Sequence, residues 1–89
     1  MRYTEAVGKR LGTLLKKRGL TQKEFSQKSH VSRVTINRII HGRVDVVTFE
    51  TLLIFCKTLD MTLGDFFDSE LFHKDIEMGG KKRGRYVQS

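Results

Sequence analysis

Four side chains in the segment 33–38 have the chemistry needed to read the edges of DNA base pairs. Arg33, Val34, Asn37 and Arg38 are spaced so that a helix would place them on one face. Arginine can donate two hydrogen bonds to guanine O6 and N7, asparagine can pair with adenine N6 and N7, and valine can contact a thymine methyl group. The set therefore predicts recognition of double-stranded DNA in the major groove.

Each of these residues also has a simpler interpretation when it is taken alone. A single arginine on a helix is often only a solvated charge, and a single asparagine more often faces water than a base. Asn37 and Arg38 can also bind phosphate instead of a base. Base reading is favoured because all the candidates converge on one face of a helix.

A second group of residues is suited to holding the DNA backbone. The start of a helix near residue 22 would direct free N–H groups and the positive end of the helix dipole at an anion. Hydroxyl and cationic side chains can add phosphate contacts, which set the register but carry little sequence information. The residues predicted to do this are Thr21, Lys23, Ser32, Thr35 and Arg43, with Arg10 as a further candidate.

Two short helices joined by a tight turn, between about residues 22 and 41, would position these side chains. Their buried faces are predicted by apolar residues at helical spacing: Phe25, Val31, Ile36 and Ile39. Thr21 and Glu24 form a capping-box pattern before the first helix, and Ser32 is the expected N-cap of the second. Gly42 is expected to end it. This is the pattern of a helix-turn-helix with a recognition helix.

The rest of the sequence predicts an all-α domain of five helices around one core. The first helix is expected to begin at Thr4, as N-cap, and to end near residue 18 with Gly19 as a left-handed stop. A fourth helix, about 48–59, would bury a face made of Phe49, Leu52, Phe55, Cys56 and Leu59. A short fifth helix capped by Thr62 would close the core. Only residues 44–47 are a candidate strand.

The net charge of +7 is distributed unevenly along the 89 residues. Residues 1–43 carry eleven Lys or Arg against two acidic residues, and residues 44–78 carry two Lys against eight acidic residues. The segment 79–89 adds four more Lys or Arg. A basic excess at the helix-turn-helix and the tail is expected for phosphate binding. A high pI is common, however, so charge alone also fits a merely soluble surface.

These features predict one domain with a single modest core. Residues 1–68 are assigned to the helix-turn-helix domain, and residues 69–78 to a short C-terminal extension or dimer contact. The Gly-rich, basic segment 79–89 is expected to be a disordered tail. Three interpretations of this tail are open: an arm in the DNA minor groove, a nonspecific phosphate tether, or an inert end.

Several other classes of function find no support in the sequence. No apolar run approaches the length of a membrane span, and the N-terminus lacks an apolar signal core. The single cysteine fits a reducing cytoplasm. His30, His41, His73 and Cys56 lack metal-ligand spacing, and no nucleophilic triad or Gly-rich phosphate loop is present. We therefore expect neither an enzyme nor a metal or cofactor.

Several motifs resemble those of one family, in order and at suitable spacing over residues 7–67. LTQKEF at 20–25 resembles the family's LTQxEL opening, and VSRVTINRI at 31–39 resembles its recognition segment VSRSTISRI. FETLL with FCKTL, within 49–59, is similar to LETLxxIAKAL, and LGDFF at 63–67 resembles the closing LxDLF. The chain thus resembles the Cro/repressor-type helix-turn-helix family, also called XRE or lambda-repressor-like.

This resemblance implies a five-helix DNA-binding domain, usually dimeric, that acts in transcription regulation. It also implies that Gln22 contacts phosphate or clamps the recognition helix. Three features depart from the family pattern. His30 stands where glycine is usual, Ile40 stands where glutamate is frequent, and the loop 43–47 has three valines and no proline.

The main hypothesis is therefore a sequence-specific transcriptional regulator, a repressor that binds a near-palindromic operator as a homodimer. The candidate interface residues are Phe67, Leu71, Phe72 and Ile76, or else Val44 and Val46. These residues are also able simply to complete the monomer core. Two alternatives remain. One is an antitoxin or anti-regulator that binds a small protein partner through its acidic part and autoregulates through DNA. The other is nonspecific nucleic-acid binding by charge alone, which the absence of an aromatic stacking platform disfavours.

Overall fold

The computed structural model describes residues 1–73, and every regular element in that range is a helix. The five α-helices are α1 (Tyr3–Arg18), α2 (Gln22–Ser29), α3 (Arg33–Ile40), α4 (Phe49–Thr58) and α5 (Leu63–Phe67), followed by the 3-10 turn η1 (Glu70–Phe72). The predicted all-α, five-helix fold is therefore confirmed. Residues 44–47, the candidate strand, form a loop between α3 and α4.

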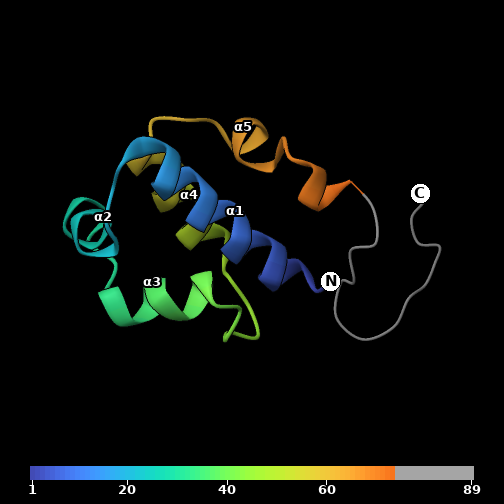
Figure 1. Ribbon diagram of the computed structural model, residues 1–89, viewed down its shortest axis with the longest axis horizontal. Coiled ribbons are helices and arrows are strands. Elements are labelled where there is room, and N and C mark those ends of the chain that lie inside the picture. The colour runs from blue at the N-terminus through green and yellow to red at the C-terminus, as the bar shows by residue number, and fades with distance from the viewer. Residues whose placement is uncertain (74–89) are drawn as a thin grey trace.

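Helix α1 is the central element of the fold (Figure 1). It packs against α3, while α2 packs against both α3 and α4. Helix α5 packs against α4, and η1 returns to α1. In Figure 1, α3 lies along the lower edge of the molecule, with α4 behind α1. No helix among residues 1–73 is long and apolar enough to cross a membrane.

The core forms where the apolar faces of the five helices meet. Its largest fully buried side chains include Phe25, Phe55 and Phe66, and the Phe25 and Phe55 rings lie 5.3 Å apart between centroids. Cys56 is buried in this core, and burial raises the pKa of its thiol. The thiol therefore remains protonated at neutral pH and packs as a small apolar group.

The contact between α1 and α3 depends on the absence of a side chain at Gly8. A Cβ atom at this position would lie 2.0 Å from the carbonyl oxygen of Ile39. One turn further along α1, a Cβ at Gly12 would lie 3.6 Å from Cγ2 of Ile40, an ordinary van der Waals distance. Ile40, one of the three departures from the family pattern, is partly buried against the core. The C-terminal end of α3 thus packs directly against the backbone of α1.

The ends of the helices largely follow the predicted capping pattern, with one correction. Gly19 has φ 65° and ends α1, as predicted. Helix α1 begins at Tyr3, however, with Arg2 as N-cap, so the prediction of Thr4 as N-cap was wrong. The Arg2 N–H donates to the Glu5 carboxylate at 2.9 Å, and Thr4 lies inside the helix with 1% of its surface exposed.

The predicted inner face of α4 also needs one correction. Leu52, Phe55 and Cys56 are buried on that face, as expected, whereas Phe49 is 63% exposed. Val47 is buried just before α4 instead, and its backbone N–H donates to the Tyr3 hydroxyl at 3.3 Å. The chain therefore enters α4 with Val47 rather than Phe49 directed into the core.

Arginine side chains of α1 hold the C-terminal helices in place. Arg10 donates from Nε to the Phe66 carbonyl at 2.6 Å and from Nη2 to the Asp65 carbonyl at 2.7 Å. Arg18 donates in the same way to the carbonyl of Leu59 at the end of α4. Both cations thus satisfy carbonyl groups at helix ends, where the helix dipole favours positive charge. The structure therefore places Arg10 in a structural role rather than the phosphate-binding role considered above.

We expect Arg10→Met to lower the free energy of unfolding by about 1–3 kcal/mol, because it leaves two carbonyl groups without their charged donor. The methionine keeps most of the packing of the arginine stem, so the loss reports the hydrogen bonds. Lys9→Met is the matched control. Lys9 is exposed on the same helix, and this substitution also removes one positive charge. Urea unfolding curves of the two variants should differ clearly, and equal midpoints would contradict this role for Arg10.

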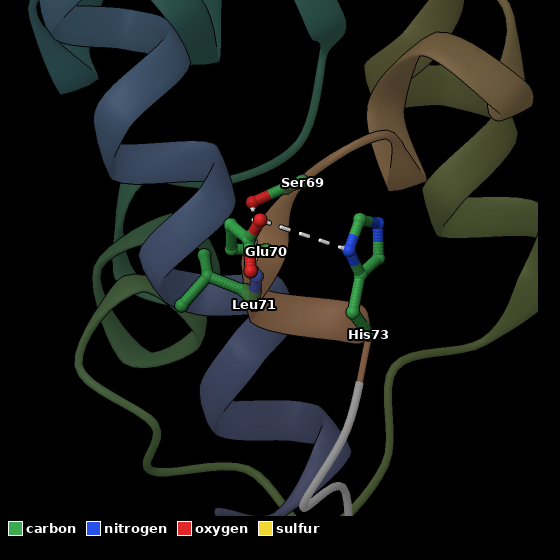
Figure 2. Close-up of polar contacts among 4 residues, drawn as sticks. All are labelled: Ser69, Glu70, Leu71 and His73. Carbon is green, nitrogen blue, oxygen red and sulfur yellow. Dashed lines mark hydrogen bonds and ion pairs between the residues drawn. The ribbon is translucent and has the colours of Figure 1, made fainter.

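The chain after α5 forms a compact turn that packs on the core. Figure 2 shows its polar contacts: the Leu71 N–H donates to Ser69 Oγ at 3.2 Å, and His73 Nδ1 lies 4.0 Å from a Glu70 carboxylate oxygen. The side chains of His73 and Glu70 are largely exposed, so an ion pair between them contributes little stability. The rings of Phe66, Phe67 and Phe72 pack against one another, with centroids 4.8–6.4 Å apart. Ile76 and the basic tail lie outside the described residues.

Candidate nucleic-acid interface

Helix α2 begins with the capping box that its sequence predicted. The Glu24 N–H donates to Thr21 Oγ1 at 3.0 Å, and the Thr21 N–H donates to the Glu24 carboxylate at 2.8 Å. The hydrogen bond from the Thr21 backbone is the main reason that the pKa of Glu24 lies below its ordinary value. The stabilising effect of this carboxylate is therefore present at neutral pH and is lost as the pH falls through that lowered pKa.

The turn between α2 and α3 uses a left-handed residue and a small hydrogen-bond network. His30 has φ 64°, which explains why many family members have glycine at this position. Ser26 Oγ donates to the Val31 carbonyl at 2.6 Å, and the Val31 N–H donates to Ser29 Oγ at 3.2 Å. Together these bonds hold α3 at a defined angle to α2 despite the backbone cost at His30.

Helix α3 is capped by Ser32, as predicted. The Thr35 N–H donates to Ser32 Oγ at 3.1 Å, and the Ser32 hydroxyl donates to Thr35 Oγ1 at 3.0 Å. These hydroxyls are both exposed, and the cap keeps them at the first turn of α3. At the other end, His41 Nδ1 lies 2.9 Å from the Asn37 carbonyl oxygen. His41 is the C-cap of α3, at the position where the sequence predicted the second helix to end.

The structure brings the four candidate base-reading residues onto the outer face of α3. Arg33, Val34, Asn37 and Arg38 are all exposed, whereas Ile36 and Ile39 are buried beneath them. Val34 is 67% exposed, so its methyl groups are accessible from outside the protein. Within residues 1–73, the guanidinium groups of Arg33 and Arg38 make no hydrogen bond or ion pair. Their donors are therefore available to a ligand.

A side-chain hydrogen bond connects the outer face of α3 to the start of α2. Asn37 Nδ2 donates to Gln22 Oε1 at 3.1 Å. Gln22 is the first residue of α2, so the bond joins the helix start expected to face a phosphate with the face expected to read bases. The family resemblance implies that Gln22 clamps the second helix of the motif, and the structure identifies Asn37 as the residue that it contacts there.

The candidate phosphate-binding residues lie at the starts of α2 and α3 and in the loop after α3. Thr21, Gln22 and Lys23 lie at the start of α2, and Arg43 lies in the loop after α3. The capping box occupies the N–H groups of Thr21 and Glu24, and the first bond within the helix is made by Phe25. The intervening N–H groups of Gln22 and Lys23 are therefore the ones that a phosphate can approach.

A sequence model described as the Cro/C1-type HTH DNA-binding domain matches residues 10–70. The chain belongs to this family. The family resemblance stated from the motifs is thereby confirmed, and the chain is a helix-turn-helix DNA-binding domain of the kind found in transcription regulators. The match covers all of α2 and α3, including every residue assigned above to base reading.

Three solved structures are similar to this Cro/C1-type domain. An HTH_3 family transcriptional regulator from Vibrio cholerae is 25% identical with a TM-score of 0.71, and the match covers 76% of this chain but 38% of that one. The restriction-modification controller protein C.AhdI from Aeromonas hydrophila is 23% identical with a TM-score of 0.67, covering 72% and 96% of the two chains. The clp gene regulator ClgR from C. glutamicum is 28% identical with a TM-score of 0.66, covering 71% and 80%. No curated protein matches the sequence.

Proposed function

We propose that this Cro/C1-type domain is a sequence-specific repressor that binds a near-palindromic operator as a homodimer. The observation that carries this proposal is the outer face of α3. Arg33, Val34, Asn37 and Arg38 are exposed there, and the two guanidinium groups have no partner among residues 1–73. In a family that binds DNA through its helix-turn-helix, such a face is suited to the major groove.

The proposed roles divide between reading and anchoring. Arg33 donates to guanine, Arg38 donates to a base or a phosphate, Val34 contacts a thymine methyl group, and Asn37 pairs with adenine or binds phosphate. Anchoring to the two DNA backbones is assigned to Thr21, Gln22, Lys23, Ser32, Thr35 and Arg43. The excess of positive charge in residues 1–43 supports this arrangement, because it lies in the part of the chain that includes α2 and α3.

A second copy of the chain is proposed because one domain of this size contacts only a single half-site, and specific affinity usually requires two. Phe67 and Phe72 are partly buried and stack with Phe66, so much of their apolar surface serves the monomer. Val46 and Phe49, in contrast, are each 63% exposed. Leu53 of α4 is 38% exposed as well. Of the second interface considered from the sequence, these exposures favour Val46, whereas Val44 packs against the monomer core.

Selection of binding sites from random DNA duplexes tests this proposal directly. We expect a motif with two inverted half-sites whose centres are about one helical turn, or 34 Å, apart. Light scattering at micromolar concentration should show a dimer on the selected duplex. Equal recovery of all sequences would contradict specific reading and favour binding by charge alone. A monomer both with and without DNA would contradict the dimer.

A further inference from the structure

We propose that His41 binds the DNA backbone only when its imidazole is protonated, so that DNA binding by this domain takes up a proton and weakens as the pH rises. The inference rests on the proposed function and adds a dependence of affinity on pH. The observation behind it is the place of His41 Nδ1, which lies 2.9 Å from the Asn37 carbonyl oxygen at the end of α3.

The contact with Asn37 decides which ring nitrogen of His41 is left for a ligand. A carbonyl oxygen only accepts hydrogen bonds, so Nδ1 carries the proton. This carbonyl belongs to the backbone of α3 and cannot turn over, and it also accepts the His41 backbone N–H at 3.1 Å. Rotating the ring by half a turn would replace Nδ1 by a carbon and lose the bond. In the neutral ring Nε2 therefore has a lone pair, and it makes no hydrogen bond within residues 1–73.

The charge state of His41 determines whether Nε2 can bind a phosphate. A phosphate oxygen is a negatively charged acceptor, so it does not bind the lone pair of a neutral ring. Protonation makes Nε2 a charged donor, while Nδ1 keeps its bond to the carbonyl. The charge lies at the C-terminal end of α3, where the helix dipole favours it. Imidazole groups ordinarily gain or lose their charge between about pH 5 and 8, so the contact is made at the acidic end of this range and lost as the pH rises.

The place of His41 on α3 brings it to the level of the DNA backbone. Helical periodicity keeps His41 on the same face as Val34 and Asn37, and all three are exposed. From Val34 to His41 the helix rises by about 10 Å. The major groove is about 8.5 Å deep and about 12 Å wide. With the N-terminal residues of α3 at the base edges, His41 is therefore near the phosphates at the edge of the groove.

The charged groups around His41 come from α1 and from its own segment of the chain. On α1 they are Glu5, Lys9 and the α-amino group of Met1, whose residues line the same open cleft as His41, and on its own segment they are Arg38 and Arg43. Glu5 is the one acid among them, and its carboxylate accepts the Arg2 N–H at 2.9 Å. An arriving phosphate therefore balances an excess of positive charge that includes the protonated His41.

The test measures proton uptake when the full chain binds a duplex. Titration calorimetry at pH 7 in two buffers of different ionisation heat should show an uptake of up to about one proton per protomer. At constant ionic strength, affinity should rise by about tenfold per protomer from pH 8 to pH 6, as expected for one charge-assisted hydrogen bond. The pKa of Glu24 lies below its ordinary value, so its carboxylate stays ionised and the cap of α2 is unchanged over this range.

His41→Gln is the decisive variant, because it keeps a neutral donor near the position of Nε2 and cannot gain a charge. For the wild type, the slope of log affinity against log salt should be steeper at pH 6 than at pH 8 by about 1 per protomer, since one more cation meets phosphate. His41→Gln should lose this difference together with the proton uptake. A residue that only capped α3 would change Tm without changing either quantity.

The other two histidines provide matched controls. His73→Gln removes the imidazole that follows η1, and His30→Asn removes the one in the turn before α3, where asparagine tolerates the left-handed backbone. Both variants should keep the wild-type proton uptake and the wild-type change of salt slope.

Three results would overturn the inference: no proton uptake by the wild type, an unchanged uptake in His41→Gln, or loss of the uptake in His30→Asn or His73→Gln instead. A phosphate contact does not depend on sequence, so each protein is measured on a random duplex as well as on the selected operator. Equal affinity for the two duplexes would refute specific reading and leave the result for His41 standing. The failure of the inference and the failure of the proposed function are therefore distinguishable.

Discussion

Gly8→Ala is expected to destabilise the domain by about 3 kcal/mol, the upper part of the range for forcing extra atoms into a packed contact. The new methyl group would lie 2.0 Å from the Ile39 carbonyl oxygen, so α1 and α3 must separate. That oxygen belongs to the backbone and cannot move out of the way by changing a rotamer. For a domain of this size, the change corresponds to a fall in Tm of about 12–24 °C, measurable by circular dichroism.

Gly12→Ala is the matched control, because it adds the same methyl group to the same helix one turn later. Its Cβ would meet only Cγ2 of Ile40, at 3.6 Å. Replacing glycine by alanine inside a helix stabilises it by about 0.5–1 kcal/mol, so this variant should be as stable as the wild type or more stable. If the two variants had the same Tm, the close approach of α1 and α3 at Gly8 would be refuted.

Arg33→Ala is expected to have a large effect on operator binding while leaving the fold intact. The side chain is exposed and makes no hydrogen bond within residues 1–73, so the Tm should not change. Loss of a bidentate contact to guanine costs about 1–3 kcal/mol at each half-site, which lowers affinity by about 5- to 150-fold. A dimer would lose this binding free energy twice, once at each half-site. Fluorescence anisotropy on the selected operator and on a random duplex measures the difference.

Arg43→Ala provides the comparison for Arg33→Ala, since it removes the same side chain from a residue assigned to phosphate. We expect it to weaken binding to operator and random DNA by similar factors, and to reduce the slope of log affinity against log salt by about 1 for each protomer, or about 2 for the dimer. Arg33→Ala should instead weaken binding to the operator much more than binding to the random duplex. Equal losses on both duplexes for Arg33→Ala would show that this residue binds phosphate and does not read a base.

Features that depend only on neighbouring residues could be predicted from the sequence. The caps at Thr21, Ser32 and Thr62 were predicted and are confirmed, as is the left-handed stop at Gly19. Each arises from a side chain or a backbone preference acting within one turn of the chain, so no distant contact is needed to specify it. The outer face of α3 follows from the same local rule, because helical periodicity alone separates Arg33 and Asn37 from Ile36.

Which surfaces pack together depends on how the helices are arranged in the folded protein. Phe49 is apolar and correctly spaced, yet it is exposed because Val47 enters the core before it. Arg10 has the charge of a phosphate ligand, yet its donors reach carbonyl groups more than fifty residues away. The bond between Gln22 and Asn37 likewise requires α2 and α3 to be docked. These contacts depend on the relative positions of whole helices, which no local pattern encodes. The approach of α1 to the Ile39 carbonyl, which the absence of a side chain at Gly8 allows, depends on helix positions in the same way.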